Sequence, residues 1–313
     1  MQQIVIFFLG LIGLWLGAEL VIRGALGLAR KFGLSENFIG LIVLALGTGL
    51  PEIMVSVTGA IEHGKGVDTA GIVVGNIIGS NMSNMVFVLG SVGILGGSMV
   101  MKKQEVWRQG LAVVAATLLF LVFASDGLIS RTEGWAFLVT YLFYFIIVSR
   151  SQAKTPVKKR KHKQPPWKLA LILLAGIILL GEASNRVIES GIEIAASLGV
   201  SQLVVGAVLV GVGTSLPELV VSVKAAMQGA KDLSVSNLVG SNIINILLAL
   251  GLAAVISGLP IERHVAQFDL PFLLFTMIVV ALFSLSRGKL ERKESWLLLG
   301  LYGVYVSLKL LGW

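Results

Sequence analysis

The stretch GTGLPE at residues 47–52 lies inside a long apolar run, and it recurs as GTSLPE at residues 213–218. Two glycines, a proline and a glutamate are unusual in a helix that crosses lipid. A charged side chain at the centre of a bilayer costs about 3 kcal/mol or more, so an ionisable residue at that depth is a functional candidate by default. Because the stretch occurs twice, Glu52 and Glu218 are the first candidate functional residues.

The composition is that of a membrane protein with many spans. Of the 313 residues, 56% are hydrophobic and 13% are charged, whereas soluble domains have about 25% charged residues. The mean hydropathy is +0.90. The net charge of +8 does not indicate a nucleic-acid partner, because in a membrane protein the distribution of basic residues between loops matters more than their total. The absence of cysteine excludes disulfides and thiolate metal sites.

Apolar windows between polar breaks predict ten membrane-spanning helices, so the expected fold is an all-α polytopic membrane protein. The first run has no basic leader and no small-residue cleavage site, which favours a retained span over a signal peptide. The ten spans are expected at residues 3–22, 37–61, 70–97, 108–125, 134–149, 168–188, 201–227, 234–258, 269–285 and 296–312.

Most lysines and arginines lie in the connections after odd-numbered spans. The longest basic stretch, at 154–168, is interpreted as a solvated cytoplasmic linker close to anionic headgroups, in preference to a nucleic-acid patch. The connections after even-numbered spans have few basic residues, mainly Lys65, Arg131 and Arg263. Because basic loops stay on the cytoplasmic side, both termini are expected outside.

The two halves of the chain repeat one another. Each half has five predicted spans, and an odd number forces the second copy to enter the membrane the other way up. Inverted repeats with interrupted spans are typical of secondary transporters, whose ion site lies where the repeats meet. At an offset of 166, the motif at 47–52 matches 213–218, and at an offset of 161, GNIIGSNMSNMVFVLG (75–90) matches SNLVGSNIINILLALG (236–251). The expected divisions are a first repeat at 1–150 with its motif region at 40–90, a basic linker at 151–167, and a second repeat at 168–313 with its motif region at 206–251.

The residue types of the motif favour a hard cation. Proline has no amide hydrogen, and its ring clashes with the carbonyl four residues back. Pro51 and Pro217 therefore free carbonyls around residues 45–48 and 210–214, and free carbonyls at membrane depth persist only where they line a cavity or meet an ion. Ca2+ takes about six to eight oxygens, and two converging glutamates balance its charge. Neutral oxygens are available from repeated side chains nearby: Asn84, Asn245, Ser80 and Ser241.

Other small or charged residues are expected to have structural roles. Glycines at spacing four, such as Gly75 and Gly79, are expected to form helix-packing faces. Glu19 with Arg23, and Glu182 with Arg186, are expected to be i,i+4 pairs near helix ends. Four acids near predicted boundaries are expected to be solvated: Asp126, Glu189, Glu193 and Asp269. The three histidines lie in connections and do not form a cluster that would suggest zinc or a proton relay.

The paired motifs GTGLPE…GNIIGSNMSN and GTSLPE…SNLVGSNIIN resemble the two alpha-repeats of the sodium/calcium exchangers, within the calcium/cation antiporter superfamily. The resemblance is to the prokaryotic type and covers essentially the whole chain. It implies an electrogenic antiporter in the plasma membrane of a prokaryote, in which Na+ entry drives Ca2+ export. It implies no enzymatic activity and no cofactor, with Ca2+, Na+ and the lipid bilayer as partners. The chain is expected to act as a monomer.

The resemblance also implies four cation sites in a diamond. The ligands it implies are Glu52, Glu218, Thr48 and Thr214 at the centre, Asn84 and Asn245 beside them, and Ser80, Ser241, Ser215, Ala45 and either Val210 or Gly211 at the periphery. Two positions depart from the family pattern. Gly49 stands where many members have serine, and Asn245 stands where potassium-dependent members have aspartate. With only two central carboxylates, exchange is expected not to require K+.

Other functions fit the residues less well. A Ca2+/H+ or other divalent-cation antiporter of the same fold is the main alternative, although the proline-containing motif argues against the proton branch. An intramembrane hydrolase would need a nucleophile with a base, or two aspartates, within the membrane, and the sequence shows neither. A channel would not need a charge-matched site that two ions occupy in turn.

Overall fold

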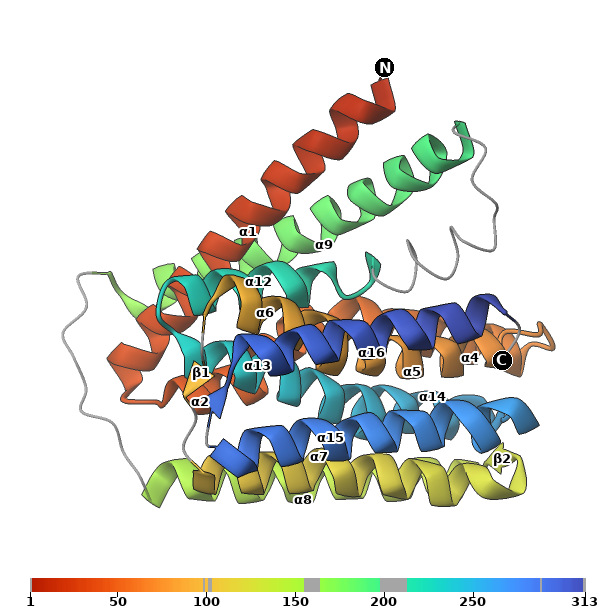
Figure 1. Cartoon of the computed structure of the whole chain (residues 1–313). Helices are drawn as coiled ribbons and strands as arrows, with labels where there is room; N and C mark the ends of the chain where they lie inside the picture. The colour runs from red at the N-terminus through yellow and green to blue at the C-terminus, as the bar shows by residue number, and fades with distance from the viewer. Residues whose placement is uncertain are drawn as a thin grey trace.

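The chain folds into a bundle of helices in the computed structural model, which describes residues 2–97, 99–100, 103–154, 164–197, 213–287 and 289–311 (Figure 1). The first half contains α1 (Gln2–Phe32), α2 (Glu36–Phe38), η1 (Ile39–Leu44), α3 (Ala45–Thr48), α4 (Leu50–Gly64), α5 (Ala70–Met82), η2 (Ser83–Val88), α6 (Leu89–Leu95), β1 (Met99–Val100), α7 (Lys103–Phe123), η3 (Ala124–Asp126), β2 (Leu128–Ile129) and α8 (Arg131–Lys154). The second half contains α9 (Pro166–Ser197), α12 (Leu216–Met227), α13 (Lys231–Ile243), η5 (Ile244–Ala249), α14 (Leu250–Ser257), β3 (Leu259–Pro260), η6 (Val265–Asp269), α15 (Leu270–Arg287), β4 (Lys289–Leu290) and α16 (Arg292–Leu310).

The helix of span 2 is broken where the motif predicts. Gly49 separates α3 from α4 with φ −83° and ψ 5°, and Pro51 lies in the first turn of α4. The two parts of the span are bent by 49°. Before α12, Ser215 has nearly the same conformation, φ −89° and ψ 9°, and Pro217 lies in the first turn. The predicted break is confirmed in span 2, and residues 198–212, which include the first part of expected span 7, lie outside the described residues.

The two halves also match in a feature that the sequence did not predict. In expected span 3, the α-helix α5 passes into the π-helix η2 and then into α6. In expected span 8, α13 passes into the π-helix η5 and then into α14. The π-helices begin at Ser83 and Ile244, which are equivalent in the repeat. Single π-turns within α-helices are rare and occur frequently at functional sites.

Helices α1 and α9 form a close pair that crosses the other helices obliquely (Figure 1). Glycines permit this approach. A Cβ atom at Gly10 would lie 2.6 Å from Cγ2 of Val187, and one at Gly24 would lie 2.7 Å from the backbone nitrogen of Leu173. Gly10 and Gly24 on α1 therefore let the backbones of the two helices touch, which is how small residues act in membrane helix pairs.

The short strands place successive connections at the two ends of the bundle. β1 pairs with β4, so the connections after expected spans 3 and 9 lie together, and β2 pairs with β3, so those after spans 4 and 8 lie together. Figure 1 shows the first residue of α1 and the last of α16 toward the end where β2 lies. In the described part of the chain, seven helices are long and apolar enough to cross a membrane, or eight if the bent pair of span 2 counts as one. Ten spans and their inverted arrangement therefore stay predictions.

The apolar core has two parts, and the broken span lies between them. The larger cluster includes Ile77, Val86, Leu238 and other residues of spans 3, 4, 8 and 9. The smaller cluster joins α1 and α9 to α12. The π-helix η1 contributes Leu41 to the first cluster and Leu44 to the second, so the chain before the break is buried on both sides.

Candidate cation site

Glu52 and Glu218 are both fully buried, at 0% exposure. The two come from opposite halves of the chain, and the Glu218 carboxylate lies beside the first-half break: a Cβ atom built at Gly49, three residues before Glu52, would lie 4.0 Å from Oε1 of Glu218. Neither oxygen of either carboxylate has a hydrogen-bond partner in the described part of the chain. A buried carboxylate without a partner is strongly unfavourable. Such a pair therefore requires cations or protons.

Hydroxyl groups surround the two carboxylates, and they come from the opposite half as well as from the same half. Ser80 lies beside the Glu52 carboxylate, whereas Thr48 and Ser241 lie beside that of Glu218. The Ser80 and Thr214 hydroxyl oxygens are 3.4 Å apart. The structure therefore brings together hydroxyls that the sequence assigned to central and peripheral positions.

The predicted carboxamide ligands are also buried and unpaired. Asn84 and Asn245 are 0% and 1% exposed, and neither their amide nitrogens nor their oxygens have a described partner. The hydroxyls of Ser215 and Ser241 are unpaired as well. Most buried polar side-chain atoms in native proteins have at least one partner. A group of unpaired oxygens beside two carboxylates is therefore suited to bind a hard cation.

Two of the backbone carbonyls that were expected to be free near the helix breaks accept hydrogen bonds within the protein. Gly213, whose carbonyl loses its intrahelical donor to Pro217, accepts a hydrogen bond of 3.2 Å from the Ser184 hydroxyl on α9. The expectation that the break frees the Ala45 carbonyl is wrong, because that carbonyl keeps the backbone N–H of Gly49 as its donor at 3.1 Å. Only its second lone pair remains for an ion. Residues 210–211, the other predicted carbonyl ligands, lie outside the described residues.

Position 49 faces the site even though glycine has no side chain to offer. A Cβ atom built there would lie 2.8 Å from the Ala45 carbonyl oxygen, 3.9 Å from Oδ1 of Asn245 and 4.0 Å from Oε1 of Glu218. The equivalent Ser215 has an unpaired hydroxyl. The departure noted in the sequence therefore removes one oxygen from the first half of this site.

A second layer of side chains holds the glutamate helices, and sequence reasoning gave these residues no role. In the first half, Nδ2 of Asn76 donates to the backbone oxygen of Glu52 at 3.2 Å and to the Ser56 hydroxyl at 3.3 Å. In the second half, Nδ2 of Asn237 donates to the Ser222 hydroxyl at 3.2 Å. Both pairs recur at the repeat offsets, which was the signal available in the sequence.

The second layer also crosses between the halves. The Thr48 hydroxyl donates to the Leu44 carbonyl at 3.1 Å and lies 3.4 Å from Oδ1 of Asn237. Asn237 therefore contacts α12 through its amide nitrogen and Thr48 through its amide oxygen. A ligand of one half is held by a side chain of the other.

A cavity of about 370 Å3 lies between α4 and α9, next to the site. It is lined by Thr48 and Pro51 at the break, by Met54 on α4, and by Ile178 and Asn185 on α9. Thr48 lines the cavity and also belongs to the buried polar cluster, so the cavity lies next to the cluster.

Comparison with known proteins agrees with this geometry. The model of the family described as "Sodium/calcium exchanger protein" matches residues 2–150 and 168–311. The chain belongs to the sodium/calcium exchanger family. It is 32% identical to the "Putative antiporter CaxA" of Alkalimonas amylolytica over 90% of both chains, and 28% identical to the "Sodium/calcium exchanger MaX1" of Methanosarcina acetivorans over 96% of both. A solved structure of the sodium-calcium exchanger NCX_Mj superposes with a TM-score of 0.84 at 29% identity, covering 98% of each chain. The protein is thus a membrane antiporter of the exchanger family, with the fold of NCX_Mj.

Two expected structural roles outside the exchanger site are wrong. Asp269, expected to be solvated, is 2% exposed and pairs with Nζ of Lys309 at 2.9 Å. Glu19, expected to pair with Arg23, pairs with Lys224 on α12 at 3.0 Å. Both errors arise because residues far apart in the sequence become neighbours only when the helices pack.

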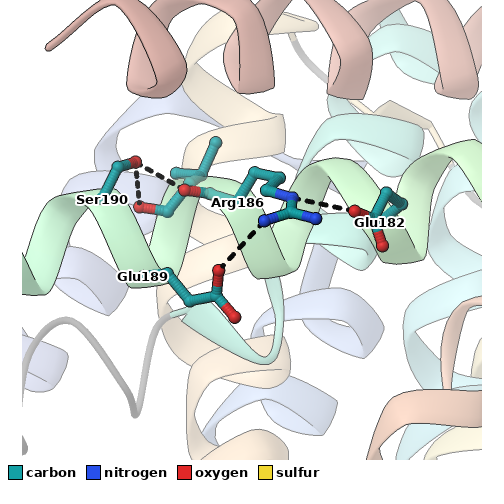
Figure 2. A network of polar contacts seen from close by, with 5 residues as sticks. Glu182, Arg186, Glu189 and Ser190 are labelled. Atoms are coloured by element: carbon teal, nitrogen blue, oxygen red, sulfur yellow. Dashed lines mark hydrogen bonds and ion pairs between the residues drawn. The ribbon is translucent and has the colours of Figure 1, made fainter. Parts of the chain in front are cut away.

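The expected pair of Glu182 with Arg186 is confirmed, whereas the expected packing role of small residues is confirmed in the second half and wrong for the glycines of the first. Arg186 pairs with Glu182 at 2.8 Å and with the exposed Glu189 at 3.6 Å (Figure 2). Gly240 is a packing glycine, since its Cβ would lie 2.5 Å from the Leu41 carbonyl. At Gly75 and at Gly79, the equivalent of Gly240, a Cβ would meet no described atom within 4 Å, so the expectation that these two glycines form a packing face is wrong.

Proposed function

We propose that the protein exchanges Na+ for Ca2+ across the membrane, exports Ca2+ electrogenically, and does not require K+. The observation that carries this proposal is the buried pair of Glu52 and Glu218, which have no described partner and lie among unpaired hydroxyl and carboxamide oxygens. The proposed ligands are Glu52, Glu218, Thr48, Thr214, Asn84, Asn245, Ser80, Ser241, Ser215, Ala45 and Gly211.

Charge balance supports exchange rather than cotransport. Two carboxylates are neutralised by one Ca2+ or by two Na+, so the two ions compete for the same negative charge. An electrogenic cycle would require a third Na+, and uncharged oxygens such as those of Ser80 and Ser215 are suited to bind it. The site is uncompensated when empty, and an uncompensated buried charge is expensive. It is therefore unfavourable for the empty site to change its access from one side of the membrane to the other, which favours exchange of one ion for another.

The family fold supports alternating access as the mechanism. Transporters of inverted repeats bind at the midplane and move one part against another around the site. The cavity between α4 and α9 is the proposed access route from one side. The proposed cycle binds ions there, closes the cavity and opens an equivalent route between α12 and α1.

The test is Ca2+ uptake by proteoliposomes that contain only this protein. An outward Na+ gradient is expected to drive uptake, and replacing K+ by choline with the membrane potential clamped is expected to leave the rate unchanged. Uptake that needs K+ would contradict only the proposal that exchange does not require K+. Absence of Na+-driven uptake in correctly folded protein would contradict the proposed function.

A Ca2+/H+ antiporter is the second candidate, because unpaired buried carboxylates can also take up protons. The same vesicles distinguish the two. An outward proton gradient in the absence of Na+ should not drive Ca2+ uptake if Na+ is the counter-ion, whereas uptake driven by protons alone would favour this alternative.

A further inference from the structure

Lys224 on α12 is a buried cation that lies outside the proposed ion ligands. Its side chain is 6% exposed, and its Nζ lies 3.0 Å from the Glu19 carboxylate on α1. Nζ also donates to the Trp15 carbonyl at 2.8 Å and lies 4.2 Å from the centroid of the Trp15 ring. Gln228, one turn further, donates to the Glu19 carboxylate at 2.9 Å. Because a charge buried within a membrane protein needs its partners, α1 must lie here to satisfy Lys224.

The two equivalent surfaces of the repeat are used differently in this structure. α1 packs directly on α12, where Val21 of α1 and Val221 of α12 belong to one apolar cluster. In the repeat, α9 is equivalent to α1 and α4 is equivalent to α12. There the cavity of about 370 Å3 lies between Val55 of α4 and Asn185 of α9. One of the two equivalent contacts is therefore closed and the other is open.

The closed contact has a lysine that the open one lacks. At the offset of 166, Lys224 matches Thr58 on α4. At an offset of 163, Glu19 matches Glu182 on α9. Glu182 is bound to Arg186 of its own helix, as Figure 2 shows. If α9 closed onto α4, Glu182 would therefore meet Thr58, where Glu19 meets Lys224 in the other half.

We propose that Lys224 is a positioning residue of the transport cycle, which holds α1 against α12 and biases the protein toward the conformation that is open between α4 and α9. By the symmetry of the repeats, the opposite conformation closes α9 onto α4 and separates α1 from α12. Reaching it breaks the contacts of Lys224 with Trp15 and Glu19 and creates no equivalent contact at Thr58. The inference rests on alternating access, which is part of the proposed function, and not on the identity of the transported ions.

The chain has no cysteine, so a single cysteine at the exposed Asn185 reports on the cavity. In the Asn185→Cys background, labelling by a membrane-impermeant thiol reagent is measured in choline buffer without Na+ or Ca2+. Lys224→Met removes the tie, and Thr58→Lys adds the missing lysine to α4. Each change is expected to slow labelling on the order of fivefold, because each shifts the equilibrium away from the open cavity. Lys224→Arg, which keeps the charge, is the matched control and should label like the parent.

Two outcomes would overturn the inference. The first is labelling that is unchanged or faster in both variants. The second is slow labelling in Thr58→Lys that persists when Glu182→Gln is added, because the new lysine would then act without its proposed partner. Thr58 is exposed, so Thr58→Lys removes no buried contact and keeps the test valid if Lys224→Met fails to fold. Because labelling does not require transport, a failure of this inference can be distinguished from a failure of the proposed Na+/Ca2+ exchange.

Discussion

Glu52 and Glu218 place two negative charges together in the interior of a membrane protein. Neither has a described partner, and the side chains around them are hydroxyls and carboxamides. An isolated buried charge costs several kcal/mol, so the ion itself is part of the stable structure. The residues with the largest expected effects are therefore those that change the charge of the site or the number of oxygen atoms that can bind an ion.

Glutamine at either position should abolish Ca2+ transport. Glu52→Gln or Glu218→Gln keeps the side-chain size and leaves Ca2+ with one compensating charge. Breaking a buried charge pair costs about 3–5 kcal/mol, which corresponds to a loss of Ca2+ affinity of at least about a hundredfold. Na+-driven Ca2+ uptake and equilibrium Ca2+ binding are the measurements. Glu189→Gln, a neutralisation on the exposed face of α9, is the control. Near-normal exchange in either site variant would remove it from the proposed ligand set.

Serine at position 49 should strengthen Na+ binding. The Cβ position at Gly49 faces Asn245 and Glu218 but lies only 2.8 Å from the Ala45 carbonyl oxygen, so the turn must shift to accept a side chain. Ser215 has nearly the same φ and ψ with a side chain in place. Gly49→Ser therefore adds a hydroxyl where Ser215 already has one in the second half. One added polar contact contributes about 1 kcal/mol, or roughly a fivefold lower Na+ concentration at half-maximal exchange. Gly49→Ala supplies the same Cβ without the oxygen and separates ligation from packing. An equal effect of alanine and serine would contradict a ligand role.

The repeat in the sequence predicted which residues meet but not how they are supported. Glu52, Thr48 and Asn84 could be named because each has an equivalent in the second half. The roles of Asn76 and Asn237 could not be assigned, because their hydrogen bonds form only when one span packs on another. The contact between Lys224 and Glu19 has no equivalent in the other half, so comparison of the repeats could not indicate it.

Two kinds of helix irregularity build the site at the level of the elements. The break at Gly49 and Pro51 ends α3 and restarts α4 at a bend of 49°, and proline and glycine predict such a break from the sequence. The π-helices η2 and η5 begin just before Asn84 and Asn245. They have no comparable composition signal, which is why the sequence did not predict them.

Alanine at position 237 should weaken Ca2+ binding, although Asn237 is not itself a proposed ligand. Asn237 holds Ser222 of α12 and lies against the Thr48 hydroxyl. Loss of residues that orient metal ligands typically reduces affinity about 10- to 100-fold. Asn237→Ala should therefore raise the Ca2+ concentration at half-maximal exchange by about tenfold. Thr117→Val removes a buried hydroxyl that bonds only within α7 and should not change it. A similar shift in both variants would indicate a general packing effect.

The whole molecule is organised as two halves that meet at the site, with connections gathered at two ends. The β1–β4 and β2–β3 pairings assign connections to one end or the other. The pairings agree with expected spans that cross the membrane in alternating directions, so that connections after odd-numbered spans lie at one end and those after even-numbered spans at the other. The absolute orientation follows from charge alone, since basic connections stay in the cytoplasm.

Single cysteines should determine that orientation, because the native chain has none. A cysteine in the basic linker, at residues 155–163, should react with an impermeant thiol reagent only from the cytoplasmic side. One at the exposed Asp68, between α4 and α5, should react only from outside. The expectation has a physical cause: the linker carries many lysines and arginines, whose transfer across the membrane is unfavourable, whereas the 64–70 connection has only Lys65. Right-side-out and inverted vesicles, with a permeabilised sample as the control for reactivity, provide the measurement. Labelling of the two cysteines from the same side would contradict an odd number of crossings between them. The reverse pattern would overturn the orientation that the charge distribution predicts.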